Sequence, residues 1–246
     1  MSGRLRDVEM RTKLFETATK IKTLEHHLHF AEDPILALRT FLESNSLDLG
    51  ASIDHAVNVA ALAGRLCEAF GCDPYEVAEV SIAAMFHDIG KIGIPVEILE
   101  KSGLLTEDER QIVRTHVTLG REILSQGNTA ALKLAAQVAY CHHERWDGNG
   151  YPNRVEGDTI PFAARVVAIT DVYDAITSER TYHRALEHHE AIRKLTTELS
   201  SHFDPALLSK FCARFPDRES ILKTTTSFRC DLLTRTTKSA LKDDPK

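Results

Sequence analysis

The apolar residues of the sequence recur every three or four positions over most of the chain, which is the spacing of amphipathic helices. No stretch alternates apolar and polar residues as regularly as a half-buried strand would. The segments with helical spacing are residues 52–70, 74–87, 106–123, 129–142, 161–175 and 205–215. The pattern predicts an all-α fold, built as a bundle of several helices.

Local signals mark where several of these helices begin. Asp73 and Asp204 each precede a proline, the pairing expected of an N-cap followed by the first helical position. Thr106 stands three residues before Glu109, as in a capping box, and either Asn128 or Thr129 can cap the next helix. These caps define where the predicted helices begin more precisely than the sequence defines where they end.

Both ends of the chain are expected to lie outside the main domain. A faint heptad of apolar residues between about residues 5 and 45 predicts a helical arm, either for homodimerisation or as the stub of a longer linker. From residue 217 the sequence is polar and rich in threonine, which predicts a mobile tail. We therefore divide the chain into an arm at 1–46, a domain at 47–216 and a tail at 217–246.

Composition narrows the class of protein. The chain has 246 residues, 43% of them hydrophobic, and a net charge of −6, so no overall basic surface is available for polymeric nucleic acid or an anionic membrane. A small anionic ligand held by local cations remains open. The start of the chain lacks the apolar core of a signal peptide, and no apolar run approaches the ~20 residues of a membrane helix. We expect a cytoplasmic protein without a membrane partner.

The five cysteines are scattered without CxxC spacing in a chain large enough to fold without cross-links. Free thiols are therefore expected rather than disulfides or a zinc finger.

Five histidines and two aspartates lie on, or at the ends of, the inward faces of five successive predicted helices. They are His55, His87, Asp88, His116, His142, His143 and Asp171. A single helix histidine is more often a core or capping residue than a ligand, and the adjacent pair could simply cap a helix C-terminus. Together, however, the set is what facing helices assemble around metal ions. It is large enough for two ions, with Asp88 as the natural bridge, and suits Fe, Mn or Zn better than Mg or Ca.

Several ordered motifs then identify a family resemblance. Residues 87–91 read HDIGK and residues 142–152 read HHERWDGNGYP, and further matches follow at Asp171 to Asp174, at Arg180 and at Phe203-Asp204-Pro205. In these motifs the sequence resembles the HD-GYP family of bacterial cyclic di-GMP phosphodiesterases, a branch of the HD metal-dependent phosphohydrolases. The resemblance runs from about His55 to Phe215 and implies a bundle of the HD type with its metal site in the interior.

The resemblance implies a role for each matching residue. All seven histidines and aspartates would be metal ligands, Asp88 and Lys91 would be catalytic, and Lys91 would reach the substrate phosphate. Further substrate contacts would come from the signature loop and the basic residues beyond it. These are Gly150, Tyr151, Pro152, Arg180, His183 and Arg184. For Lys91 and Arg180 the alternative is ordinary solvated surface charge.

Three positions depart from the family pattern. The glutamate that supplies a third metal in some members is Ala51 here, which favours two ions, Fe or Mn, although Asp48 or Asp54 could substitute. The arginine often found three residues after the first histidine is Asn58, and the usual Arg-Pro-Tyr reads Arg180-Thr181-Tyr182. These changes leave the set of metal ligands intact, and we expect them to alter substrate affinity and turnover.

Three functions compete at this point. The first is hydrolysis of cyclic di-GMP to linear pGpG, with GMP as a further product, through a hydroxide that bridges the two ions. The second is a catalytically weak, metal-containing module that binds a cyclic dinucleotide or docks other signalling proteins through the Gly150-Tyr151-Pro152 loop. The third is a general HD nucleotide phosphohydrolase, for which that loop has no evident purpose. No GxSxG, P-loop or cysteine-nucleophile motif points elsewhere.

Overall fold

A computed structural model describes residues 50–179 and 184–240, with the side chains of 50–52 and 231–240 left aside. The arm expected at residues 1–46, together with Arg180 and His183, lies outside the described residues. Every regular element of the described part is a helix, which confirms the all-α prediction. No helix in this part combines the length and the apolar character needed to cross a membrane.

Ten α-helices and three short 3₁₀ turns make up the described ranges. They are α3 (Gly50–Phe70), α4 (Pro74–Met85), η1 (Ile89–Gly93), α5 (Val96–Leu99), α6 (Glu107–Arg114), α7 (His116–Leu124), α8 (Ala130–Cys141), η2 (Gly157–Thr159), α9 (Phe162–Thr177), α10 (His188–Thr197), η3 (Ser200–His202), α11 (Pro205–Arg214) and α12 (Arg218–Ala240).

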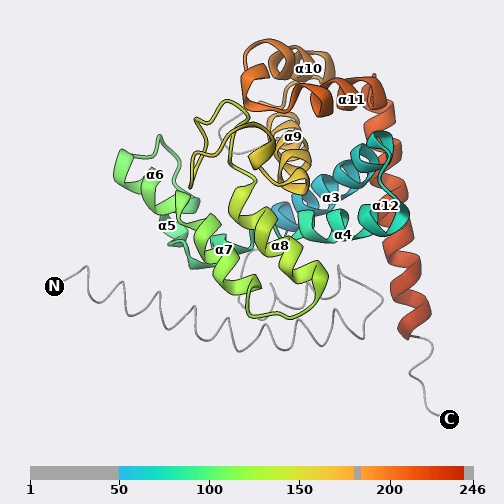
Figure 1. The fold of residues 1–246 in the computed structure, drawn as a ribbon, viewed down its shortest axis with the longest axis horizontal. Helices are drawn as coiled ribbons and strands as arrows, with labels where there is room; N and C mark the ends of the chain where they lie inside the picture. Colours follow the sequence, from blue (N-terminus) through green and yellow to red (C-terminus); the bar gives the residue numbers. More distant parts are fainter. Residues whose placement is uncertain (1–49, 180–183, 241–246) are drawn as a thin grey trace.

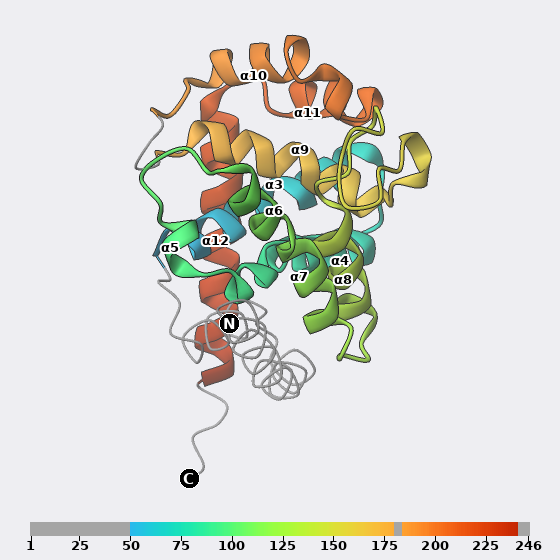
Figure 2. The ribbon, with the colours of Figure 1, turned by 90° about the vertical axis from the view of Figure 1, so that its left-hand side faces the viewer.

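Helix α3 lies at the centre of the bundle. It packs against α4, α9, α11 and α12, and its residues Val59, Leu62 and Leu66 are fully buried. Helices α10 and α11 cover one end of the bundle, whereas α7 and α8 lie toward the other (Figure 1, Figure 2). Most of the apolar stripes predicted from the sequence meet in one large core, while Cys141, Ile160 and Ala164 form a small second cluster.

The predicted helix starts agree with the structure. Asp73 accepts hydrogen bonds from the amides of Tyr75 and Glu76, and Thr106 forms a capping box with Glu109. Thr129 caps α8, so it is the N-cap of the two candidates. The side chain of Asp204 accepts from the first amides of α11. Each cap fixes a helix that carries or supports a residue of the site described below.

The long helix expected over residues 106–123 is instead two helices that meet at Thr115. The Thr115 hydroxyl donates to the carbonyl of Ile112, a local bond that competes with a continuous helix. The break makes His116 the first residue of α7 rather than a mid-helix residue.

Three further helices, the short α5 together with α10 and α12, were not expected from the sequence. Helix α10 opens with a Glu187–Glu190 capping box that begins a mostly polar segment. Helix α12 occupies residues predicted to form a mobile tail, and it packs along α3 by burying Ile221, Thr224 and Thr225 (Figure 1). Two of these three buried residues are threonines, so the buried face of the helix is not marked by apolar residues alone.

Candidate metal centre

The seven predicted ligand side chains converge on one place inside the bundle. Their nitrogen and oxygen atoms fall into three overlapping groups, within each of which the atoms lie within 4.8 Å of one another. One group holds Asp88, His116, His142 and His143, another holds His55, His87 and Asp88, and the third holds His87, His142 and Asp171. Asp88 therefore joins the first two of these groups, as a bridging carboxylate would.

The His87-Asp88 turn reaches the cluster because α4 ends just before it. Helix α4 stops at Met85, and the amide of Ile89 then bonds back to the carbonyl of Phe86 to start η1. Gly90 lets η1 pack directly against α7, since a Cβ at this position would stand 1.9 Å from the His116 carbonyl oxygen. This close approach brings Asp88 and His116 into one site.

Backbone carbonyls orient three of the imidazoles. Nδ1 of His87 lies 2.7 Å from the Ala84 carbonyl oxygen, Nδ1 of His116 lies 2.6 Å from that of Val113, and Nδ1 of His142 lies 3.0 Å from that of Ala139. A carbonyl can only accept, so each Nδ1 carries a proton, and the neutral form of each ring has its lone pair on Nε2. That is the tautomer a metal ligand requires.

The second ring nitrogen of each of these three histidines has no hydrogen-bond partner. Nε2 of His87, His116 and His142 and Oδ1 of Asp88 are all buried and unpaired. Buried polar atoms are rarely left unsatisfied, and here several converge on one point. The arrangement fits divalent cations, which would satisfy all of these lone pairs at once.

A carboxylate rather than a carbonyl orients His55. Its Nδ1 lies 2.7 Å from Oδ2 of Asp174, and its Nε2 lies 3.2 Å from Oδ1 of Asp171. Asp174 ends one of the motifs matched in the sequence, but it was not counted among the predicted site residues. The signal that could have found it was its position one turn beyond Asp171 on the same face of α9.

The electrostatics of the cluster follow from burial and from the two aspartates. Burial lowers the pKa of His116 and His142, and lowers that of His143 to about 4, so these imidazoles are neutral at physiological pH. Burial alone would raise the pKa of Asp88, but Lys91 and His87 outweigh it and hold the pKa well below its ordinary value. The site thus presents ionised carboxylates and, at His116, His142 and His143, neutral imidazoles, the forms that bind metal. Burial would lower the pKa of His87 too, but Asp88 and Asp171 outweigh it and raise the pKa to about 10, and Asp171 and Asp174 likewise raise the pKa of His55, so metal binding would displace protons from these two residues.

Lys91 extends from η1 back to the cluster. Its Nζ lies 2.5 Å from Oδ2 of Asp88, and its side chain is 42% exposed. The lysine is therefore a cation at the rim of the site, with one side open to an incoming anion.

The loop between α8 and α9 closes over one side of the cluster. The Tyr151 ring stacks on the His143 imidazole at 4.8 Å, and the Arg114 guanidinium lies 5.2 Å from the centre of the Tyr151 ring. Gly150 permits this packing, because a Cβ there would stand 2.4 Å from the amide nitrogen of Arg145. The aromatic residue of the loop thus lies beside a candidate ligand.

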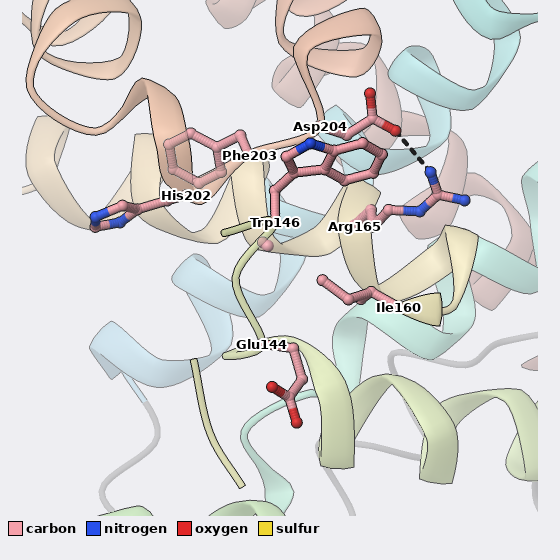
Figure 3. A pocket seen from close by; sticks show the side chains of 8 residues that line it. Glu144, Trp146, Ile160, Arg165, His202, Phe203 and Asp204 are labelled. Atoms are coloured by element: carbon pink, nitrogen blue, oxygen red, sulfur yellow. Dashed lines mark hydrogen bonds and ion pairs between the residues drawn. The ribbon is translucent and has the colours of Figure 1, made fainter. Parts of the chain in front are cut away.

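A second network holds the base of this loop. Arg145 pairs with Asp147, whose carboxylate also accepts from the Ser201 hydroxyl at 2.8 Å. Arg165 lies over the Trp146 ring and pairs with Asp204 at 2.7 Å (Figure 3). The hollow lined by Trp146, Arg165 and Asp204 has about 10 Å³, room for about one water, and none of the seven predicted ligands lines it. We regard it as part of the loop's support.

The structure does not bring every predicted residue together. Arg184 is exposed, and Arg180 and His183 lie outside the described residues, as does Asp48. Asp54 pairs with Arg229 of α12 at 2.6 Å, so its carboxylate is engaged away from the cluster.

Comparisons with known proteins agree with this geometry. A sequence-family model described as HD domain matches residues 33–207 of this chain. A cyclic di-GMP phosphodiesterase of Thermotoga maritima is 41% identical over 157 residues, which are 64% of this chain and 43% of the relative. The 3'3'-cGAMP-specific phosphodiesterase 2 of Vibrio cholerae is 35% identical over 178 residues, 72% of this chain and 34% of the relative. The chain thus spans less than half the length of these two relatives.

Among solved structures, a protein of Bdellovibrio bacteriovorus titled HDG"Y"P superposes with a TM-score of 0.55 at 16% identity, covering 82% of this chain and 63% of the other. A cyclic GMP-AMP specific phosphodiesterase of Vibrio cholerae gives a TM-score of 0.54 at 14% identity, over 72% and 50% of the two chains. At these identities the superpositions show the fold alone. The family model covers well over half of the chain and confirms the predicted HD domain.

Proposed function

Because the chain belongs to the HD domain family, we propose that it is a metal-dependent phosphodiesterase that hydrolyses cyclic di-GMP to linear pGpG, with GMP as a further product. The observation that carries this proposal is that several buried nitrogen and oxygen atoms, each able to ligate a metal, converge on one place and lack a hydrogen-bond partner. Neither a packing role nor helix capping accounts for several such atoms facing one another.

The substrate class rests on the names of the relatives. One is named for cyclic di-GMP and another for 3'3'-cGAMP, and both ligands are cyclic dinucleotides. We favour cyclic di-GMP because several of the related proteins carry that name. The mixed cyclic dinucleotide is the second candidate.

We assign the seven converging side chains as the ligands of two divalent cations, Fe or Mn by the mixture of imidazole and carboxylate. When bound, such a pair supplies an activated water and neutralises charge on the phosphodiester. Asp88 would orient both halves of the site, since it belongs to two donor groups. The carbonyl-held histidines would keep their Nε2 lone pairs aimed inward.

Residues at the rim of the metal site would bind the dinucleotide. Lys91 would donate to a phosphate oxygen and offset its charge. Tyr151 and Arg114 would offer a flat aromatic and cationic surface to a base, and the same loop is where another signalling protein would dock. Arg184 is exposed and would serve as a further cation for the second phosphate.

The test combines metal analysis with turnover. The full chain is purified without oxygen, its metal content is measured by elemental analysis, and cyclic di-GMP, 3'3'-cGAMP and a mononucleotide are offered side by side. We expect about two Fe or Mn per chain and hydrolysis of cyclic di-GMP. Metal without hydrolysis of either cyclic dinucleotide would favour a binding module, and hydrolysis of the mononucleotide alone would favour a general phosphohydrolase. A chain without metal would overturn the site.

A further inference from the structure

We propose that Arg229 of α12 is a positioning residue for the metal centre and acts on the ligand His55 through Asn58 and Asp174. The inference rests on the metal site of the proposed function, but not on the identity of the substrate. It gives the C-terminal helix a role in metal binding that its polar sequence does not reveal.

Three side-chain hydrogen bonds connect the helix to the ligand. Nη2 of Arg229 donates to Oδ1 of Asn58 at 3.0 Å, and Nδ2 of Asn58 donates to Oδ1 of Asp174 at 3.0 Å. Oδ2 of Asp174 then lies 2.7 Å from Nδ1 of His55. These three bonds form a relay that runs unbroken from Arg229 through Asn58 and Asp174 to His55. The imidazole of His55 in turn faces Asp171.

The chemistry of the groups fixes the direction of every bond. A guanidinium can only donate, so Asn58 must turn its carbonyl oxygen toward Arg229 and its amide hydrogens toward Asp174. The carboxylate of Asp174 can only accept while ionised, so His55 carries its proton on Nδ1. Nε2 of His55 is then free to ligate a metal. Without Arg229, the Asn58 amide loses the contact that sets its orientation.

Arg229 also has a plainly structural contact, which the test must separate from the relay. Its Nη1 donates to Oδ1 of Asp54 at 2.6 Å, and the Asp54 side chain is 64% exposed. An exposed ion pair of this kind contributes little to stability and helps only to dock α12 on α3. Asp174, in contrast, is 6% exposed, and it also accepts from the Ser178 hydroxyl at 3.3 Å.

The experiment measures Mn²⁺ affinity of the full chain by isothermal titration, together with the melting temperature of the metal-free protein. Arg229→Ala, Asn58→Ala and the double variant are compared with the wild type. Loss of a residue that orients a ligand typically weakens metal binding about 10–100-fold, and we expect a loss in that range for each single variant. Because both residues act in one relay, the double variant should lose no more than either single one.

Two further variants separate positioning from docking. Arg229→Lys keeps the charge next to Asp54 but cannot reproduce the fork that also reaches Asn58, so we expect it to recover melting temperature but not Mn²⁺ affinity. Lys223→Ala removes another cation of α12, which pairs with Glu219 at 2.6 Å on the outer face, and should bind Mn²⁺ like the wild type. Asn58→Ala leaves the Arg229–Asp54 pair in place and keeps the test decisive if Arg229→Ala unfolds.

Wild-type Mn²⁺ affinity in Arg229→Ala, or losses that simply add in the double variant, would overturn the relay. Affinities that follow the melting temperature in every variant would do the same. Since the readout is metal binding, a wild type that binds Mn²⁺ but hydrolyses no dinucleotide would reject the proposed reaction and leave this inference supported.

Discussion

The two carboxylate oxygens of Asp88 face different partners. Oδ1 lies 3.4 Å from Nε2 of His116 and 3.9 Å from that of His142, whereas Oδ2 lies 3.3 Å from Nε2 of His87. No other residue of the cluster belongs both to the group of potential ligands that contains His116 and to the one that contains His55. The loss of this side chain should therefore affect both groups.

Asp88→Ala is expected to abolish hydrolysis and remove most of the bound metal, because it takes a potential ligand from two groups at once. The loss of metal affinity should exceed the about 10–100-fold that an outer partner costs. His143→Ala, which removes a member of one group only, is the comparison and should retain more metal. Elemental analysis after dialysis decides between them, and equal metal content in Asp88→Ala and wild type would reject the assignment.

Lys91→Ala should keep its metal and lose rate, since the lysine is placed to act on phosphate. Removing one charge-stabilising donor typically costs about 10²–10³ in kcat. Lys101→Ala is the matched control, because Lys101 pairs with Glu109 outside the cluster. Unchanged turnover in Lys91→Ala would mark the residue as ordinary surface charge.

Asp147 gives the loop a pH dependence whose sign can be stated. The hydrogen bonds from Arg145, and then those from Asn149 and Ser201, hold the pKa of Asp147 below its ordinary value. The ionised form therefore stabilises the folded chain above about pH 4, and this contribution is lost as the pH falls further. We expect Asp147→Asn to melt below the wild type at pH 6 and the gap to shrink toward pH 3. A gap that stays constant with pH would contradict this.

The single residues of the cluster could be found from the sequence because each lies at helical spacing or in a short motif. His55 and Asp171 follow the apolar stripes of their helices, and His142 follows that of α8. The relay could not be found this way. Asn58 and Arg229 are 171 positions apart, and only the packing of α12 on α3 brings them together.

At the scale of secondary structure, the contact between η1 and α7 determines whether the two halves of the site meet. The pair touches at Gly90, where a Cβ would also stand 2.5 Å from the amide nitrogen of Gly120. Both clashing atoms belong to the backbone, which cannot move aside as a flexible side chain would. A single methyl group here should separate Asp88 from His116.

Gly90→Ala is accordingly expected to cost about 1–3 kcal/mol of stability and to reduce metal content. Gly103→Ala is the matched control, because a Cβ at Gly103 meets no atom within 4 Å. Thermal melts and elemental analysis on both variants test the claim. It fails if the two substitutions behave alike.

The helices show where prediction from sequence stops. Strong caps at Asp73, Thr106 and Asp204 fixed helix starts in advance. The break at Thr115 could not be anticipated, because the apolar period continues across it. Helix α12 was missed for the opposite reason, since the threonines that it buries against α3 carry no clear period.

For the whole molecule, the cluster ties together segments from distant parts of the chain. Its members come from α3, the turn after α4, α7, the end of α8, and α9. A metal bound there links all of these segments in the folded state and none of them in the unfolded state. Metal binding should therefore stabilise the entire domain.

We expect Mn²⁺ at about 100 times its dissociation constant to add about 2.7 kcal/mol to the stability. The rise in melting temperature should be reversed by a chelator and should be absent in Asp88→Ala. Differential scanning calorimetry measures it. An equal rise in Asp88→Ala would mean that the ion binds elsewhere.

The Lys91–Asp88 ion pair has a consequence for how the protein matures. Its ammonium gives the buried acid a positive neighbour before any metal arrives, so the carboxylate is not left unbalanced while the chain folds. Small zinc domains, in contrast, collapse only around their ion. We therefore expect this chain to fold before it binds metal; a bound cation would then balance the Asp88 carboxylate and leave Lys91 available to the substrate.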